Sequence, residues 1–332
     1  MTQWSELPAD FPERKRVLLT ASCRDCDDLP RAPDAGSCGR DAQGDYQVMH
    51  NGIRVVRGGY YGEWMEEIIR RLRGVHEPQE ERIFHEVIAR LPAGATMLEL
   101  GGFWAWYSLW FQHAVPGGHS FVVEPDPAHL AVGRANFARN GCAATFTQAC
   151  VGASSVPALR FRCESDGLEH TIEQVGLVDF LERHGIERLD LLHADVQGAE
   201  TALLEGARAC LEARRIRFVF VSTHHHLISG DPLTHQRCLA LLRDAGAAVL
   251  VEHSVAESFS GDGLIVASFD PRDADLARIQ ISRARACDGI FREIEYDLDE
   301  AWAKLRKRRE RRERKALRPH RRVARWLGLS GR

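Results

Sequence analysis

The chain has 332 residues, of which 44% are hydrophobic and 27% charged, as is ordinary for a globular protein with a large core. Its net charge of −3 conceals an asymmetry, because residues 304–332 carry a local charge of +12 and the rest carries −15. We expect no transmembrane helix, because no apolar run approaches about eighteen residues, and no signal peptide, because the N-terminus is polar and acidic. The nine cysteines are scattered and odd in number, which favours a reducing compartment and predicts a cytoplasmic protein.

Residues 1–75 are rich in Gly, Asp and Arg, and we interpret them as a cap on the substrate side of a larger domain. The spacing of Cys23, Cys26 and Cys38 resembles part of a zinc site. No fourth ligand with suitable spacing is evident, so we predict no metal in this protein.

Beyond the cap, short apolar runs alternate with amphipathic stretches. Helices are predicted at 76–91, 103–115, 128–141, 175–184, 199–213 and 234–246. Strands are predicted at 95–100, 119–125, 143–152, 189–196, 215–223, 247–252 and 263–269. This alternation indicates parallel βαβ units, hence an α/β fold with an open, mostly parallel, doubly wound seven-stranded sheet and helices on both faces. We divide the chain into a cap (1–75), an α/β domain (76–272) and a basic helical extension (273–332).

Two acidic residues follow predicted strands at the edge where doubly wound sheets bind ligands. The first strand ends in Glu99 and is followed by Gly101 and Gly102, which allow a turn or the close approach of a ligand. Glu124 ends the second strand, where a carboxylate accepts the hydroxyls of an adenosine ribose. No phosphate-binding pattern stands beside it, which favours a nucleoside without pyrophosphate, such as S-adenosylmethionine. A plain tight turn, and a surface position for Glu124 before Pro125, are the alternatives.

Three stretches together resemble the FkbM-type family of S-adenosylmethionine-dependent methyltransferases: LELGGFWAWYSL, FVVEPDPAHLAVGRANFARNG and LDLLHADVQGAETALLEGA. The resemblance covers about residues 76–270. It implies a class I, Rossmann-like methyltransferase sheet, S-adenosyl-L-methionine as cofactor, and O-methylation of a sugar, polyketide or similar hydroxyl. The family turn reads acid-x-Gly-Ala-Asn-x-Gly, and this chain has Phe103 at the Asn and Ala105 at the last Gly. His193 stands where lysine is common, and Gln197 where glutamate is common.

For the cofactor we expect contacts with two strand ends, the glycine turn and the following helix. Glycines at the turn would let the methionine portion lie against the strand, and the first acid would face its amino group or nearby amides. Most aromatic residues of 103–111 are interpreted as core packing. The predicted cofactor-binding residues are Glu99, Gly101, Gly102, Tyr107, Ser108 and Glu124.

On the acceptor side, a hydroxyl must lose its proton to a neighbouring group. Asp195 ends the fourth strand, and His224 and His225 follow the fifth, so we predict these three as the catalytic residues. Histidine titrates near working pH. The alternatives are a helix-capping role for Asp195 and structural roles for the histidines.

We expect a small-molecule or glycan acceptor as partner and do not expect nucleic acid. The basic tail leaves two alternatives: peripheral contact with an anionic membrane, or contact with the acidic body. Two other functions stay open, an RNA-binding protein or RNA methyltransferase that uses the tail, and a catalytically degenerate module that only binds the cofactor. The residues that could enter a membrane interface are Val323, Trp326, Leu327 and Leu329.

Overall fold

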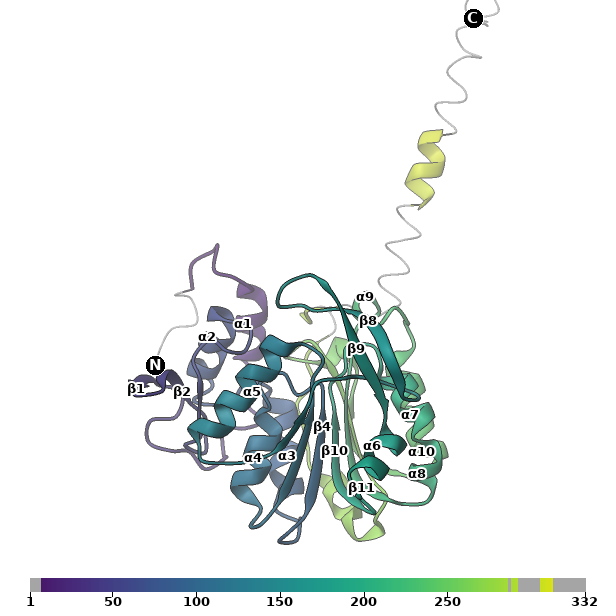
Figure 1. The fold of residues 1–332 in the computed structure, drawn as a ribbon. Coiled ribbons are helices and arrows are strands. Elements are labelled where there is room, and N and C mark those ends of the chain that lie inside the picture. Colours follow the sequence, from purple (N-terminus) through teal and green to yellow (C-terminus); the bar gives the residue numbers. More distant parts are fainter. Residues whose placement is uncertain (1–6, 286–287, 292–304, 313–332) are drawn as a thin grey trace, which may run out of the picture. The chain divides into compact units, whose positions relative to one another are not determined.

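Seven strands form a central sheet in the order β12-β13-β11-β10-β4-β5-β6 in the computed structural model (Figure 1). β10 runs parallel to both β4 and β11, whereas β13 runs antiparallel to its neighbours β11 and β12. This arrangement confirms the predicted fold class. The strands are β4 (Thr96–Leu100), β5 (His119–Val123), β6 (Thr145–Thr147), β10 (Leu189–Ala194), β11 (Ile216–Thr223), β12 (Ala248–His253) and β13 (Gly263–Ser268).

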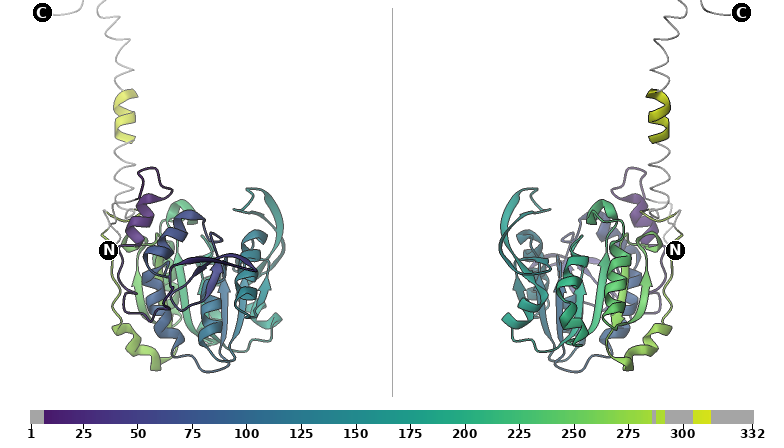
Figure 2. Two further views of the ribbon diagram at one scale, coloured as in Figure 1. Left: turned by 90° about the vertical axis from the view of Figure 1, so that its left-hand side faces the viewer. Right: turned by 90° about the vertical axis from the view of Figure 1, so that its right-hand side faces the viewer.

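Helices cover both faces of this sheet, as the side views in Figure 2 show. Successive strand side chains point to opposite faces. Along β4, Met97 accordingly belongs to the core packed by α3, α4 and α5, and Leu98 and Leu100 to the core packed by α6, α7, α8 and α10. The helices are α3 (Pro78–Ile88), α4 (Trp106–Ala114), α5 (Pro127–Arg139), α6 (Leu177–Arg183), α7 (Glu200–Gly206), α8 (Arg208–Glu212), α9 (His226–Ser229) and α10 (Thr234–Asp244), with 3₁₀ helices at Val255–Glu257 and Pro271–Arg278.

The structure describes residues 7–285, 288–291 and 305–312. Met1–Phe291 form one compact unit and Arg292–Arg332 a second, in which residues 305–312 are helical. The rest of the predicted tail helix, with its four apolar residues near the end, lies outside the described residues. Among the described helices, none combines the length and the apolar character needed to cross a bilayer. The three-part division of the chain stays a prediction.

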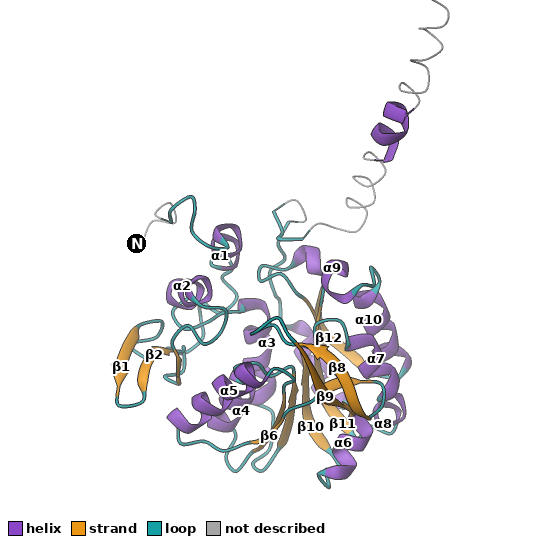
Figure 3. Ribbon diagram, turned by 45° about the horizontal axis from the view of Figure 1, so that its top comes forward, coloured by secondary structure: helices purple, strands orange, loops and turns teal. Residues whose placement is uncertain are grey.

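The N-terminal segment forms its own small elements beside the sheet (Figure 3). Hydrogen bonds that tie it to the α/β domain include Val56 N to Asn136 Oδ1 on α5 and Thr20 Oγ1 to Phe259 O, each at 2.7 Å. The elements are α1 (Arg14–Thr20), α2 (Glu63–Arg71) and an antiparallel sheet of β1 (Cys38–Asp41), β2 (Gly44–Val48) and β3 (Arg54–Val56).

Three predicted elements differ from those observed. The strand expected at 143–152 is divided, because β7 (Cys150–Gly152) leaves the central sheet and pairs with β9 (Glu169–Gly176), which also pairs with β8 (Val156–Arg162). The helix expected from residue 103 begins at Trp106, since Phe103 and Ala105 have positive φ angles. The helix expected at 199–213 is two helices, α7 and α8, that meet at Ala207.

Candidate active site

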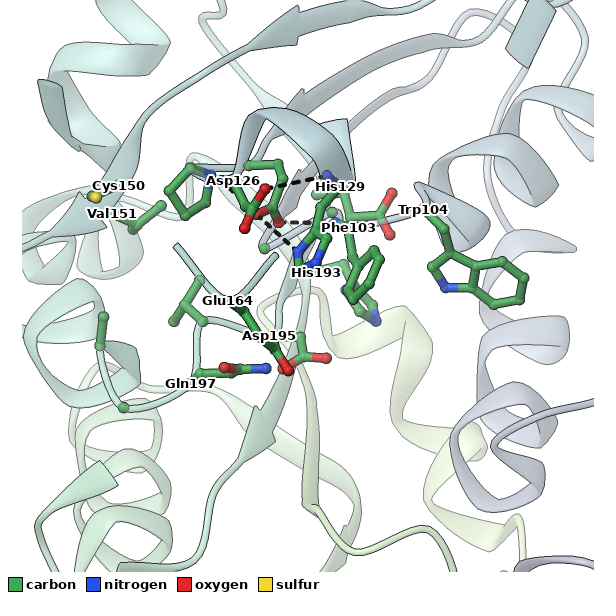
Figure 4. A pocket seen from close by; sticks show the side chains of 18 of the residues that line it. Phe103, Trp104, Asp126, His129, Cys150, Val151, Glu164, His193, Asp195 and Gln197 are labelled. Atoms are coloured by element: carbon green, nitrogen blue, oxygen red, sulfur yellow. Dashed lines mark hydrogen bonds and ion pairs between the residues drawn. The ribbon is translucent and has the colours of Figure 1, made fainter. Parts of the chain in front are cut away.

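A cavity of about 440 Å³ lies at the carboxyl ends of β4, β5 and β10 (Figure 4). The strand order reverses between β4 and β10, which is where doubly wound sheets bind ligands. The lining is strongly acidic, and its charged side chains other than histidine are Glu77, Glu99, Glu124, Asp126, Arg162, Glu164 and Asp195.

The fold brings most of the predicted site residues together at this cavity. Three of them do not line it: Ser108, His224 and His225. The roles assigned to all nine residues stay predictions. Those that line the cavity are Glu99, Gly101, Gly102, Tyr107, Glu124 and Asp195.

The glycine pair serves the protein's own packing, a reason additional to the turn or the approach of a ligand that we expected. Gly101 has a φ of 76°, and a Cβ there would stand 1.7 Å from the carbonyl oxygen of Asp195. A Cβ at Gly102 would stand 2.3 Å from Cγ1 of Val122. Both positions therefore exclude a side chain because neighbouring strands approach closely, before any cofactor is considered.

The turn after the glycines is held in a conformation that few residues favour. Phe103 and Ala105 have φ angles of 35° and 56°, in the left-handed region, where a non-glycine residue loses about 1–2 kcal/mol. They occupy the family's Asn and Gly positions, and Asn and Gly are the residues that tolerate this region. The Phe103 ring stacks on His129, with centroids 3.5 Å apart, and forms part of the cavity wall.

Glu124 is oriented by backbone amides at the end of β5. Its Oε2 accepts a hydrogen bond from Phe103 N and its Oε1 accepts one from Asp126 N, both at 2.9 Å. The side chain is 5% exposed and lines the cavity. The carboxylate is thus fixed in place and keeps lone pairs for a ligand hydroxyl.

Glu99 is tied to the start of α4. Its Oε2 accepts from Ser108 N at 2.9 Å, so Ser108 reaches the site through its amide and not through its hydroxyl. Burial raises the pKa of Glu99, although His193 and the amide partly offset this effect. Tyr107 lies beside it and donates its hydroxyl to Glu77 Oε2 at 3.0 Å.

Asp195 is supported from behind by a buried imidazole. His224 Nε2 lies 3.1 Å from Asp195 Oδ1, and His224 Nδ1 lies 2.6 Å from Glu200 Oε1. Burial alone would lower the pKa of His224, but the neighbouring carboxylates outweigh burial and raise it well above the usual value. These contacts favour the protonated form of His224, whereas the general-base role that we predicted requires the neutral form.

His225 is not among the residues that line the cavity. It caps α9, where its Nδ1 accepts a hydrogen bond from Leu227 N at 3.4 Å, and its ring stacks on Phe291 with centroids 4.5 Å apart. The two neighbouring histidines thus serve different parts of the structure.

The sequence reasoning missed several residues that complete the cavity. The N-terminal segment contributes Tyr60 and Tyr61, and β10 contributes His193. Asp126 caps α5 and also accepts from Ser165 Oγ at 2.7 Å, which fastens the β8–β9 hairpin beside the cavity. The Asp-Pro pair at 126–127 is a sequence signal for such a cap, whereas nothing local to the tyrosines indicates their position.

The cysteines considered for zinc are not brought together. Cys26 Sγ donates to Pro78 O at 3.1 Å, and Cys38 is exposed. In the described part of the chain, the one cluster of three possible metal ligands is on the β8–β9 hairpin, where an ion pair of 2.8 Å already joins His170 to Asp166. Its members are Cys163, Asp166 and His170.

Residues 92–249 match the family model described as "Methyltransferase FkbM domain". This region is an FkbM methyltransferase domain. The match confirms the family resemblance, and the cofactor of the domain is S-adenosylmethionine. No curated protein matches the chain closely enough to count as a relative.

Several solved structures resemble the chain at low identity. A precorrin-6y C5,15-methyltransferase from Geobacter metallireducens is 16% identical over 56% of this chain and 87% of its own, with a TM-score of 0.34. An O-methyltransferase from Bacillus cereus is 13% identical over 58% of this chain and 82% of its own, with a TM-score of 0.36. These values are too low to transfer an acceptor or a mechanism.

The residues at the cavity fit S-adenosylmethionine. The Glu124 carboxylate suits ribose hydroxyls, and Glu99 suits an ammonium group or a cationic sulfur nearby. Val151 and Cys150, on β7, offer a less polar wall for a base. The FkbM domain thus places carboxylates that suit the hydroxyls and cationic groups of the cofactor, and a less polar wall that suits its base, at the strand ends.

Proposed function

We propose that the FkbM domain methylates a hydroxyl group of a sugar, glycan or secondary-metabolite acceptor. The observation that carries this proposal is the position of Asp195. Its side chain is 27% exposed, lines the cavity and extends from β10, across the reversal point from β4 and β5. A carboxylate there can accept the hydrogen bond of an acceptor hydroxyl that approaches the cofactor.

The chain's own part in such a transfer is to orient the acceptor and receive a proton. S-adenosylmethionine supplies a methyl carbon bound to a positive sulfur. Glu99 and Glu124 would hold this cofactor, whose methyl group would be electrophilic because the sulfur can leave with the electron pair of the carbon–sulfur bond. Asp195 receives the hydroxyl proton, while His224 acts as a positioning residue that holds the carboxylate and is itself held by Glu200.

The charge of the cavity argues against a nucleic-acid substrate. Binding of a phosphate backbone depends on Lys and Arg, and the lining contains a single one, Arg162, against six carboxylates. The basic residues 304–332 lie in the second unit of the chain, so they say nothing about the cavity itself. A hydroxylated acceptor without phosphates fits the lining better.

The test is turnover of hydroxylated acceptors by the full chain and by Asp195→Asn. We expect the substitution to lower kcat by roughly 10²–10⁴-fold, because the proton acceptor is lost, with the affinity for S-adenosylhomocysteine within about threefold. The exposed Asp244→Asn is the control for loss of one carboxylate. Full turnover by Asp195→Asn would refute the assignment of Asp195. A wild-type protein that binds S-adenosylhomocysteine but methylates no hydroxyl would instead support a degenerate binding module.

A further inference from the structure

Three buried imidazoles each lie close to more than one carboxylate: His76 and His193 line the cavity, and His224 lies behind Asp195. His76 is 1% exposed, with Nδ1 2.5 Å from Glu81 Oε1 and Nε2 3.2 Å from Glu77 Oε2. Burial lowers the pKa of His76, but the two carboxylates outweigh burial and raise it to about 10. One imidazolium is therefore shared between two carboxylates.

The other two imidazoles, those of His193 and His224, likewise lie near more than one carboxylate each. His193 Nε2 lies 2.6 Å from Glu80 Oε1, and His193 pairs in register with Glu99 on the neighbouring strand. His224 contacts Glu200 and Asp195, as described above, and its Nε2 also lies 3.7 Å from Asp262 Oδ1. Protonation of all three rings still leaves more carboxylates than cations.

The surplus of acid groups is only partly relieved by arginine. Arg16 donates to Ser260 O at 3.1 Å and stands close enough to Asp262 to offset some of its charge. Burial nevertheless raises the pKa of Asp262 to about 6 and also raises the pKa of Glu80. An excess of buried negative charge is unfavourable unless a cation compensates it. Apart from Glu99, which suits the cationic groups of the cofactor, the carboxylates in question are Glu77, Glu80, Glu81, Asp195, Glu200 and Asp262.

Part of this surplus, Glu77 and Asp195, lines the same cavity as an aromatic side chain that suits a cation. Tyr60 lines the cavity and stacks on Trp104, with centroids 4.7 Å apart and the ring planes parallel within 1°. Aromatic faces beside carboxylates attract an ammonium group. After burial, the largest influences that raise the pKa of Tyr60 include three nearby carboxylates: Glu77, Asp195 and Asp262.

An unpartnered atom in the same cavity independently points to a ligand with an oxygen acceptor. His193 is 2% exposed and lines the cavity, and its Nδ1 has no hydrogen-bond partner among the described residues. An imidazolium nitrogen without a partner is costly in a buried place, and a ligand oxygen would satisfy it. Figure 4 shows His193 and Asp195 within the group of side chains that line this cavity.

We infer that the acceptor carries a protonated amine in addition to the hydroxyl that is methylated, as an amino sugar or an amino alcohol does. This inference rests on the proposed function and specifies its substrate class. The ammonium group would lie against Tyr60 between Glu77 and Asp195, which line the cavity; Asp262 lies near Asp195, since both carboxylates contact His224 Nε2, at 3.7 and 3.1 Å. Phosphorylated acceptors are disfavoured by the same charges.

The experiment compares matched acceptors with the full chain in the presence of S-adenosylhomocysteine. Amino sugars and amino alcohols are titrated beside their N-acetylated and phosphorylated forms, and binding is measured by calorimetry. We expect each bound amine to bind at least roughly tenfold more tightly than its N-acetylated form, because acetylation removes the charge. Equal binding of the two forms, tighter binding of a phosphorylated form, or failure of every amine to bind overturns the inference.

Two variants locate the effect. Asp262→Asn and Glu77→Gln should each reduce the preference for the amine over its N-acetylated form, whereas Glu212→Gln, an exposed carboxylate paired with Arg208, should keep it. A preference that survives both variants unchanged would contradict the proposed position of the ammonium group. Methyl transfer to neutral acceptors at the same rate as to amines would leave the proposed function intact and refute only this inference. Amine binding without any transfer to a hydroxyl would refute the proposed function instead.

Discussion

Glu124 offers the sharpest test of the cofactor site, because its carboxylate has two separable roles. One oxygen accepts from Phe103 N and the other from Asp126 N, so the side chain holds the turn as well as facing the cavity. Glu124→Gln preserves the size of the side chain but replaces one acceptor oxygen with an amide NH₂. The substitution should therefore affect both cofactor binding and the stability of the fold.

The two effects have different expected sizes. A hydrogen bond from a ribose hydroxyl to a charged acceptor contributes about 1.5–3 kcal/mol, so its loss should weaken S-adenosylhomocysteine binding by roughly 10- to 150-fold. One backbone amide also loses its acceptor, which should lower the free energy of unfolding by about 1–3 kcal/mol. Calorimetric titration measures the first quantity, and urea denaturation without ligand measures the second.

A matched control separates ribose recognition from a general loss of negative charge. Glu173→Gln removes a carboxylate of β9 that pairs with Arg183 at 3.0 Å outside the cavity, and it should leave the affinity within about threefold. A folded Glu124→Gln protein with unchanged affinity would show that Glu124 does not bind the ribose. Equal weakening by the control would show that the effect is not specific to Glu124.

Three further predictions concern stability and the tail. Gly101→Ala should destabilise the fold by more than about 4 kcal/mol or prevent folding, because the added Cβ meets the Asp195 carbonyl. The control Gly94→Ala, at a φ of 75° with open space around it, should lower the free energy of unfolding by only about 1–2 kcal/mol. Similar unfolding midpoints for the two variants would contradict this reasoning. Burial lowers the pKa of His253 to about 4, so this side chain stays neutral in the folded protein, whereas in the unfolded chain it binds a proton below about pH 6.5. The free energy of unfolding should therefore fall by roughly 3 kcal/mol as the pH drops from 6.5 to 4. Denaturation curves of His253→Gln should show a weaker dependence on pH; an unchanged dependence would contradict the assignment. Truncation after Ala303 should abolish salt-sensitive binding to anionic vesicles, because each Lys or Arg near the membrane surface contributes about 1 kcal/mol to that binding. Turnover of a small acceptor should be retained. Full-length protein that does not bind such vesicles at low salt would exclude the membrane role.

Much of the architecture follows from local sequence patterns. The short apolar runs and the amphipathic helices between them predict the layers, because a run that is apolar on both faces belongs to a strand covered on both sides and each helix buries one face. The positions of Glu99, Glu124 and Asp195 at the cavity follow from the same patterns, since parallel strands bring their carboxyl ends to one edge. The turn residues Phe103 and Ala105 mark a departure from the family pattern, but their positive φ angles were not predicted.

Other features depend on contacts between residues far apart in the chain, and only the tertiary structure decided them. The need for glycine at position 101 comes from the Asp195 carbonyl of a neighbouring strand. The pairing of Glu80 with His193 joins residues 113 positions apart. Tyr60 reaches the cavity from residues 1–75, which we interpreted as a substrate-side cap without predicting any site residue in it. His224 has the residue type of a base, but the carboxylates that surround it come from residues 195–200 and from Asp262, and they favour its protonated form. A local pattern specifies which face a side chain occupies, whereas its charge state and partners are set by whatever the fold packs against that face.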